Sequence, residues 1–334
     1  MMRLRYVIDT IPGFTRTKGW FGVVYRDEKG RKIRNANVLA RIRSLGIPPA
    51  YSSVWICPFA NGHIQATAID ARNRKQYIYH HDWIAKQNEG KFHRMNEFAV
   101  SLSRIRRRVD HDLRLRGIPK DKVLAAIVEL LDTAFIRIGN EEYAKDNHSF
   151  GLTTLRNRHV KGTGEYMGLA FDGKDGIAHE FPIEDERIRK IVATCHDIPG
   201  QKLFEYLDHE GKPHDVQSED VNEYLKSISK EEITAKDFRT WHGTVIVASY
   251  LWDRPAVETK REIQQNVKAA IQRAADALGN TVVVCKKSYI HPKVLSLYAK
   301  GKLTWHAPNE SLRKKYPLLH VHEVGLMKVL EGLN

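Results

Sequence analysis

Residues 280–292 read Asn-Thr-Val-Val-Val-Cys-Lys-Lys-Ser-Tyr-Ile-His-Pro, and the rest of the chain is organised around this stretch. Tyr289 follows two lysines at the end of a short apolar run and precedes a proline that interrupts helices. A tyrosine is usually a packing residue with a solvated hydroxyl. As a nucleophile, a phenol with an ordinary pKa of about 10 needs fixed positive charge or a base to favour the phenolate. The role of Tyr289 therefore depends on what the rest of the chain supplies.

A tyrosine that attacks a phosphodiester would need two further kinds of group. Negative charge builds up on the non-bridging oxygens in the transition state, and planar guanidinium groups are the best fixed donors to them. The departing alkoxide needs a proton, for which a lysine or a histidine is suitable. Two arginines and a proton donor are therefore the groups to look for in the remaining sequence.

The composition favours a polyanionic partner. The chain has 334 residues and a formal net charge of +14, and nucleic acid is the commonest soluble polyanion. A basic protein that is merely well solvated is the alternative. Three isolated cysteines fit a reducing compartment better than a disulfide framework. The N-terminus has no apolar signal core and no stretch is long enough to span a membrane, so we expect a cytoplasmic protein.

The length predicts two domains. Residues 1–90 are expected to be β-rich, with strands at 19–25, 54–58, 63–68 and 76–79 between turn-like segments. From about residue 91 the apolar periodicity becomes helical. Helices are predicted over 120–138, 187–195, 235–251 and 258–278, and strands over 155–160, 166–171 and 177–182. The boundary between a domain of residues 1–90 and one of residues 91–334 is expected near 85–95.

Each required group has a candidate. Arg137 falls near the end of the predicted helix 120–138. Arg239 falls in the first turns of a helix opened by a capping box at 234–237, where the positive helix end favours a bound phosphate. Lys174 is expected at the tip of a hairpin between the strands 166–171 and 177–182, although a surface lysine in a turn has the same pattern.

Two further segments leave their roles open. Gln76, Tyr77 and Tyr79 follow a basic turn and could form a nucleic-acid face or a solvated sheet edge. The basic run around Arg106 could face phosphates or solvent. Neither a phosphate-binding loop of the Walker type nor a dinucleotide fingerprint occurs, and the spacing of the histidines predicts no metal site.

Six blocks of the chain resemble signature blocks of bacterial type IB DNA topoisomerases, the relatives of the poxvirus enzyme. Four lie in the second domain: Ile-Arg-Ile-Gly-Asn at 136–140, Gly-Leu-Thr-Thr-Leu-Arg-Asn-Arg-His-Val at 151–160, Lys-Asp-Phe-Arg-Thr-Trp at 236–241 and Lys-Ser-Tyr-Ile-His-Pro at 287–292. Two lie in the first: Ile-Pro-Pro-Ala-Tyr at 47–51 and Arg-Lys-Gln-Tyr at 74–77. The resemblance covers nearly the whole chain, with the blocks in the right order.

This resemblance implies roles for five catalytic residues. Tyr289 would attack the scissile phosphodiester and hold the strand as a 3′-phosphotyrosyl ester. Arg137 and Arg239 would bind the non-bridging oxygens, and Lys174 would protonate the leaving 5′-oxygen. Asn280 matches the last phosphate-oxygen donor, a histidine in poxviral and eukaryotic relatives, and an amide can donate a hydrogen bond there but not a proton. The ester conserves the bond's free energy, so the resemblance implies relaxation of supercoiled DNA without ATP, metal or other cofactor.

The resemblance also implies the fold and the DNA contacts. The fold class would be α+β, with a small β-rich domain and a mostly α-helical catalytic domain that contains a small three-stranded sheet, closing as a C-shaped clamp around duplex DNA. A monomer on DNA, associated with the nucleoid, is expected. Gln76, Tyr77 and Tyr79 match residues that face the major groove, and phosphate contacts are expected from Arg156, Arg158 and the run around Arg106.

Three positions depart from the pattern of that family. Asn73, His81 and His242 stand where glycine, proline and a small residue are expected. They lie outside the catalytic set and affect the expected loop shapes.

Two other functions remain compatible with the sequence. A tyrosine recombinase shares the arginine and tyrosine roles, but it usually has a histidine three residues before its second arginine, where this chain has Lys236. Its N-terminal half is also helical, in contrast to the strand-rich residues 1–90. A non-catalytic DNA-binding protein descended from such an enzyme is the other alternative, although all five catalytic positions carry competent side chains.

Overall fold

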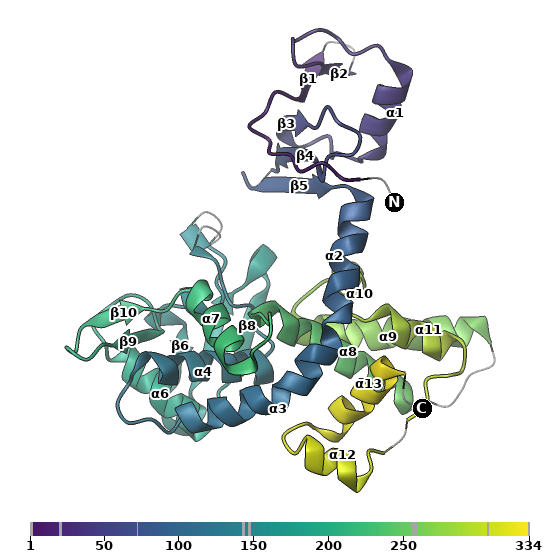
Figure 1. The fold of residues 1–334 in the computed structure, drawn as a ribbon. Coiled ribbons are helices and arrows are strands. Elements are labelled where there is room, and N and C mark those ends of the chain that lie inside the picture. Colours follow the sequence, from purple (N-terminus) through teal and green to yellow (C-terminus); the bar gives the residue numbers. More distant parts are fainter. Residues whose placement is uncertain are drawn as a thin grey trace. The chain divides into compact units, whose positions relative to one another are not determined.

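The computed structural model describes residues 3–19, 22–71, 73–141, 144–145, 148–254, 259–305 and 307–332. The chain forms two compact units, Met1–Lys91 and Phe92–Asn334 (Figure 1). Across the described ranges, none of the helices has the length and apolar character that a membrane span requires.

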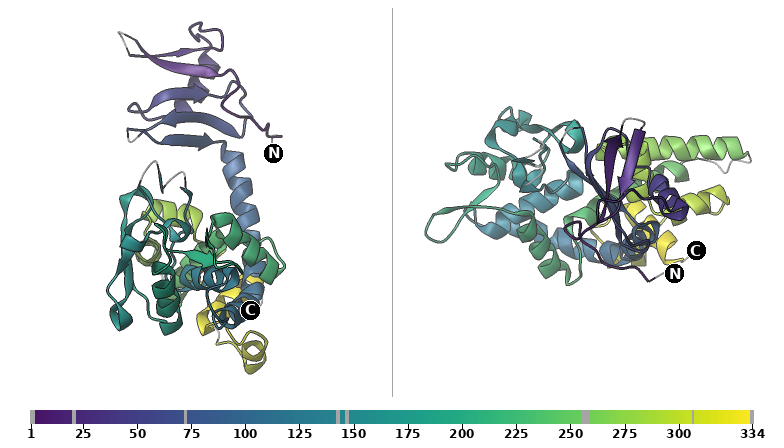
Figure 2. Two further views of the ribbon diagram at one scale, coloured as in Figure 1. Left: turned by 90° about the vertical axis from the view of Figure 1, so that its left-hand side faces the viewer. Right: turned by 90° about the horizontal axis from the view of Figure 1, so that it is seen from above.

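The first unit is built on a five-stranded antiparallel sheet in the order β2-β1-β3-β4-β5, whose strands lie one above another in the left view of Figure 2. Its elements are β1 (Phe14–Gly19), β2 (Gly22–Arg26), α1 (Ala36–Ser44), β3 (Ser52–Ile56), β4 (Ile64–Ile69) and β5 (Lys75–Tyr79). Ile42 of α1 is buried with Val54, Ile56 and Ala66 of the sheet. Burial of these apolar side chains is what holds the helix on one face of the sheet.

The sequence-based elements of this unit need three corrections. The strand expected at 19–25 is the second arm of a hairpin, because Gly19 ends β1 and β2 starts only at Gly22. Trp20 and Phe21, which were expected in that strand, lie outside the described residues. The helix α1 was missed because its start signal is a lone Asn35, whose Oδ1 accepts from two helical N–H groups. The first long helix, α2 (His81–His93), begins well before residue 91.

Two residues that depart from the family pattern fit their backbone positions. Asn73 has a φ of +60°, a left-handed conformation that glycine adopts readily and that asparagine tolerates. His81 is the first residue of α2, a position where proline is favoured in other helices.

The second unit contains the large core. Its helices are α3 (Met95–Asp112), α4 (Lys120–Thr133), α6 (Glu186–His196), α7 (Ser218–Ser229), α8 (Ala235–Trp252), α9 (Lys260–Leu278), α10 (Val282–Ser288), α11 (Pro292–Ala299), α12 (Glu310–Lys315) and α13 (Val321–Glu331). Phe98 of α3 packs edge-on against Phe238 of α8, with ring centroids 5.0 Å apart, and its ring centroid lies 5.9 Å from that of Trp241. The central α8 is therefore fixed by large buried side chains.

Two small antiparallel sheets complete this unit. β6 (Val160–Lys161), β7 (Gly168–Asp172) and β8 (Ala178–Pro182) form a three-stranded sheet, and β9 (Glu205–Leu207) pairs with β10 (Pro213–Asp215). A strand at 155–160 was the wrong prediction. Local side-chain bonds, Gly151 N to Thr154 Oγ1 at 2.9 Å and Arg156 N to His159 Nδ1 at 3.0 Å, bend this segment into 3-10 turns instead. The α+β fold class is confirmed.

The end of α4 also differs from the prediction. The helix stops at Thr133 and not at residue 138, because Phe135 takes a left-handed conformation with a φ of +56°. Arg137 therefore lies after the helix, in a segment without regular secondary structure, where its carbonyl accepts a hydrogen bond from Leu152 N at 3.0 Å.

Candidate active site

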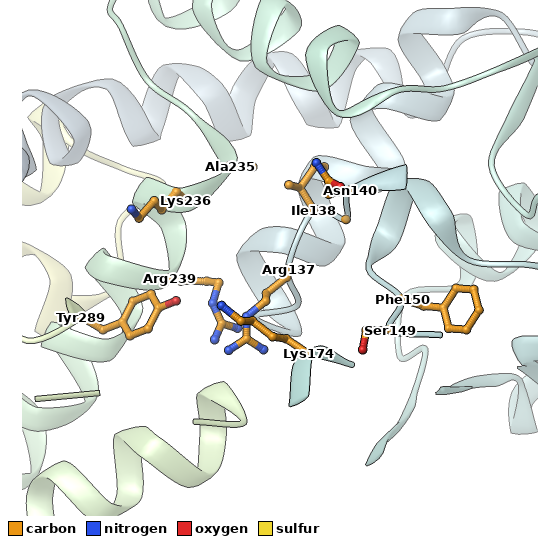
Figure 3. A pocket seen from close by; sticks show the side chains of 11 residues that line it. Arg137, Ile138, Asn140, Ser149, Phe150, Lys174, Ala235, Lys236, Arg239 and Tyr289 are labelled. Carbon is orange, nitrogen blue, oxygen red and sulfur yellow. The ribbon is translucent and has the colours of Figure 1, made fainter. Parts of the chain in front are cut away.

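Four of the predicted catalytic residues line one cavity of about 370 Å³ in the second unit: Arg137, Lys174, Arg239 and Tyr289. They come from the segment after α4, the β7–β8 hairpin, α8 and the end of α10. Their polar ends point toward one another, whereas Phe150 at the rim points away (Figure 3). The structure therefore brings together groups that are far apart in the sequence.

Tyr289 is fixed through its backbone. It caps the C-terminus of α10 and donates its N–H to Cys285 O at 2.9 Å, while its carbonyl accepts from Thr244 Oγ1 of α8 at 3.0 Å. A Cβ on Gly243 would stand 3.3 Å from Tyr289 Cβ, so glycine lets α8 come close. Pro292 occupies the first turn of α11, where its fixed φ suits a helix start.

Arg239 is held by backbone carbonyls. It is 3% exposed, its Nη1 donates to Phe135 O and its Nη2 donates to Leu278 O at 2.6 Å. Its guanidinium carbon lies 5.1 Å from the centre of the Tyr289 ring. Burial and the charge of Arg137 lower the pKa of Arg239 to about 10, so the group stays charged at neutral pH.

Both arginines keep a buried donor that nothing in the described part of the protein accepts. These donors are Nη1 of Arg137 and Nε of Arg239. Buried polar atoms in folded proteins are nearly always paired, and an unpaired donor needs an explanation. Two such cationic donors on one cavity indicate a binding place for an anion.

The pKa of Tyr289 is lowered below the ordinary phenol value. Burial alone acts to raise it, but the charges of Arg239 and Arg137 and a hydrogen bond with Arg239 outweigh burial. The charge of Lys236, which also lines the cavity, acts in the same direction. The cavity thus favours the phenolate, the form a nucleophile needs.

Lys174 lies in the turn at the tip of the β7–β8 hairpin, as predicted, and is exposed. The hairpin is packed against the turn after α9 by the ring of His179. A Cβ on Gly173 would stand 2.6 Å from His179 Nε2, and a Cβ on Gly279 would stand 2.7 Å from His179 Cε1. Burial and the charges of Arg137 and Arg239 lower the pKa of His179, so this ring is neutral at neutral pH.

Asn280 is not among the residues that line the cavity. It is half-buried, and its Oδ1 accepts from Arg137 Nη2 at 2.5 Å, while its Nδ2 lies 3.4 Å from Leu278 O. In this arrangement Asn280 supports Arg137. Its expected role as a phosphate donor stays a prediction.

The predicted DNA-contact residues of the first unit divide between the two faces of β5. Tyr77 and Tyr79 are 45% and 39% exposed, and their rings stack with centroids 6.1 Å apart. Gln76 points to the other face, because side chains alternate along a strand. Its amide donates to Asp70 Oδ2 at 3.0 Å.

In the second unit, Arg156 and Arg158 lie over the Phe150 ring, with guanidinium carbons 5.8 and 5.6 Å from its centre. Phe150 itself lines the same cavity as Tyr289. Phosphate contacts of the basic run around Arg106 stay a prediction, but Arg106 itself is already paired. Its guanidinium forms buried ion pairs with Asp132 at 2.6 Å and Glu323 at 2.7 Å.

Sequence reasoning gave no role to several groups at the site. Lys236 was noted only as a departure from recombinases. The carbonyls of Phe135 and Leu278 carry no side-chain signal, because any residue has a carbonyl. Thr244 is the other group: besides its bond to the Tyr289 carbonyl, its Oγ1 accepts from His291 N at 3.1 Å. The hydroxyl thereby holds the backbone at Tyr289 and two residues beyond it.

One group of side chains in the described ranges could hold a metal ion: His80, His81 and Asp82. It belongs to the β5–α2 junction and not to the cavity around Tyr289. His80 Nδ1 already accepts from Asp82 N at 3.1 Å, which leaves one ring nitrogen for a ligand.

Comparison with known proteins gives consistent matches. Residues 74–315 match the family model "Eukaryotic DNA topoisomerase I, catalytic core", and residues 22–70 match "Bacterial DNA topoisomerase IB, N-terminal domain". The chain is 30% identical to DNA topoisomerase 1B of Acanthamoeba polyphaga mimivirus over 292 residues, 82% of this chain and 87% of the relative. It is 23% identical to DNA topoisomerase 1B of vaccinia virus (strain Copenhagen) over 232 residues, 68% of this chain and 70% of the relative.

Proposed function

This chain belongs to the type IB DNA topoisomerases, which relax supercoiled duplex DNA, and on that premise we propose that Tyr289 is the nucleophile of its strand cleavage. The Tyr289 oxygen attacks the scissile phosphorus, and the bond from phosphorus to the 5′-oxygen breaks. The products are a 3′-phosphotyrosyl ester and a 5′-hydroxyl end. The lowered pKa of Tyr289 supports this role, since it raises the fraction of phenolate near neutral pH.

Arg137 and Arg239 bind the non-bridging oxygens of the scissile phosphate in this proposal. The observation that carries it is the pair of buried, unpaired guanidinium donors that line the same cavity as Tyr289. Charge developing in the transition state would meet donors that are already fixed by the carbonyls of Phe135 and Leu278 and by the Asn280 side chain. Asn280 contributes in one of two ways: its amide donates to the phosphate, or its Oδ1 holds the guanidinium of Arg137.

Lys174 protonates the leaving 5′-oxygen. Its ammonium group carries a transferable proton, whereas a guanidinium gives up its proton far less readily. Its place at a hairpin tip on the cavity rim allows the amine to reach the departing strand. Religation reverses these steps, so the free energy of the phosphodiester is kept and no ATP, metal or other cofactor is needed.

We further propose that residues 1–90 act as a DNA-binding domain and residues 91–334 as the catalytic domain, on a monomer bound to duplex DNA of the cytoplasmic nucleoid. Tyr77 and Tyr79 are exposed on one face of β5 and suit contact with bases, and Gln76 would join them only by leaving Asp70. Arg156 and Arg158 suit phosphates next to the cleavage site, because they adjoin Phe150 at the cavity rim.

The test is relaxation of supercoiled plasmid in EDTA without ATP. We expect a ladder of relaxed topoisomers from the native chain and none from Tyr289→Phe, which lacks only the nucleophilic oxygen. Tyr289→Phe should bind DNA non-covalently like the native protein. A covalent adduct between Tyr289→Phe and DNA would remove Tyr289 from the nucleophile role, and an absence of relaxation by the native chain at every salt concentration would overturn the function.

A further inference from the structure

His242 is a buried histidine on α8. Its Nε2 lies 2.7 Å from Asp132 Oδ1 at the end of α4. Its ring packs on the ring of Phe135, with centroids 4.6 Å apart and planes inclined by 34°. A small residue at this place would provide neither contact.

Phe135 is the residue whose backbone turns the chain from α4 to the catalytic Arg137. Its φ of +56° is left-handed, a conformation that bulky residues adopt rarely and only where surrounding contacts maintain it. This turn directs the Phe135 carbonyl at Arg239 Nη1, which donates to it. The Phe135 backbone therefore fixes one side of the Arg239 guanidinium, and the ring of His242 packs on the side chain of the same residue.

The contacts of Asp132 continue to the C-terminal helix. Asp132 accepts from Arg106 Nε at 2.6 Å, and the same guanidinium donates to Glu323 Oε2 at 2.7 Å. Glu323 is 1% exposed and also accepts from Trp241 Nε1 of α8 at 2.9 Å. Asp132 is thus itself held on two sides, which makes it a rigid support for the His242 ring.

We propose that His242 is a positioning residue for Arg239, acting by holding Phe135 in its left-handed turn. This inference rests on the proposed role of Arg239 in binding the scissile phosphate. Arg239 is anchored by two carbonyls, of Phe135 and of Leu278, and these two bonds orient its unpaired Nε. Loss of the His242 ring removes a support of the left-handed turn, so the Phe135 carbonyl turns away and the guanidinium can rotate on its remaining anchor.

The first measurement is single-turnover cleavage by the full-length chain on a duplex with one cleavage site. Removal of one fixed donor to a developing oxyanion lowers a rate by about 100- to 1000-fold. We expect His242→Ala, which displaces such a donor without removing it, to cleave about 10- to 100-fold more slowly than the native chain. Non-covalent DNA binding should change less than about threefold, because His242 is buried away from the solvent.

A substrate with a methylphosphonate at the cleavage site separates positioning of Arg239 from general loosening. Replacing one non-bridging oxygen by methyl removes the charge that Arg239 neutralises, so Arg239→Ala should lose less on this substrate than on the phosphodiester. If His242 acts through Arg239, the His242→Ala loss shrinks in the same way. An equal loss on both substrates overturns the inference.

Phe135→Gly tests the route through Phe135, because glycine adopts a φ of +56° without strain. In the Phe135→Gly background the turn no longer needs the His242 ring, so adding His242→Ala should slow cleavage no further. If His242→Ala slows the Phe135→Gly variant as much as it slows the native chain, it acts by another route and the proposal is overturned. If His242→Ala does not fold, His242→Gln is used, which lacks the ring but can still donate to Asp132, and the same results are expected of it.

Val247→Ala is the matched control. Val247 is fully buried on the same helix, and its truncation leaves a cavity that weakens the packing of α8. It should cleave like the native chain, and a loss equal to that of His242→Ala overturns the proposal. Arg239→Ala separates the two levels of inference. If Arg239→Ala cleaves normally, the proposed function of Arg239 is wrong, whereas normal cleavage by His242→Ala alone refutes only the positioning role.

Discussion

At the scale of single residues, the same side-chain types do different work according to their partners. Arg106 is half-buried and Arg239 is buried, but Arg106 is neutralised by Asp132 and Glu323. Arg239 is bound by carbonyls, which hold the guanidinium in place and leave its full charge available. That charge, next to the phenol, is what distinguishes Tyr289 from an ordinary packing tyrosine.

The pH dependence of cleavage should report this charge. Tyr289 has a folded-state pKa below the ordinary 10.0, so its phenolate fraction and the cleavage rate rise with pH to a midpoint below 10. By linkage, the matching stabilisation is present above the unfolded pKa and is lost as pH falls through the folded pKa. In Arg239→Gln the midpoint of the cleavage rate should move to higher pH. The measurement is the single-turnover cleavage rate as a function of pH, from about pH 5 to about pH 10. An unchanged midpoint would show that Arg239 does not tune Tyr289.

Lys174→Ala should cleave an ordinary phosphodiester about 100- to 10,000-fold more slowly, the range of a lost general acid. A substrate with a 5′-phosphorothiolate has a thiolate leaving group that needs no proton, so it should restore most of the rate. Lys236→Ala is the matched control, because Lys236 lines the same cavity and is assigned no proton transfer. Equal slowing of Lys174→Ala on both substrates would remove Lys174 from the acid role.

At the scale of elements, the site depends on how closely a hairpin and a helix end can approach. The His179 ring lies between Gly173 of the hairpin that carries Lys174 and Gly279 at the end of α9. Its other face stacks on Phe171, with ring centroids 5.2 Å apart. Both glycines therefore serve the contact that holds the hairpin of Lys174 at the cavity it shares with Arg137.

Gly279→Ala should destabilise the protein by about 1–3 kcal/mol, because the residue has a φ of +57° and the new Cβ would stand 2.7 Å from His179 Cε1. Gly211→Ala is the control, since Gly211 has a φ of +77° but no atom within 4 Å of the new Cβ. Thermal unfolding of Gly211→Ala measures the backbone strain alone, and that of Gly279→Ala measures the strain together with the clash against His179. Equal losses would show that contact with His179 does not matter.

At the scale of the whole molecule, charge governs association with DNA. Residues 1–91 hold 16 lysines and arginines against 6 acidic residues, so this unit carries +10 of the net charge of +14. In the second unit many cations are engaged in ion pairs, such as Arg187 with Asp110 at 2.7 Å. A paired cation releases no counterion on binding. The salt dependence of binding should therefore reflect the exposed arginines and lysines at the DNA surface, not the total charge.

Binding of a duplex, measured by fluorescence anisotropy on Tyr289→Phe between about 50 and 200 mM salt, should weaken by several powers of ten. Arg158→Ala should reduce the slope of log affinity against log salt by about one, the value for one lost phosphate contact. Arg187→Ala should leave the slope unchanged because its charge is already paired. If both variants gave the same slope, Arg158 would not contact a phosphate.

Elements whose signals lie within a few residues were predicted correctly, whereas features that depend on contacts between distant residues were missed. Helix α6 and the capping box of α8 were predicted correctly, because their signals are local: Thr234 N bonds to Asp237 Oδ2 at 2.8 Å within one turn. The end of α4 was missed, since Phe135 turns left-handed under contacts with His242 that lie far along the chain. The periodicity of apolar residues along the sequence contains no information about such long-range contacts.

The sequence by itself determined the family and the α+β class and supplied the candidates for the catalytic side chains, because chemistry requires particular functional groups and these stand in recognisable blocks. Only the tertiary structure decided which cations face a ligand and which are neutralised. Arg106 and Glu323 meet across a separation of 217 residues, and burial and pairing at that distance depend on packing. The same packing made Asn280 a partner of Arg137, turned Gln76 away from the two tyrosines and directed a phenylalanine carbonyl at Arg239.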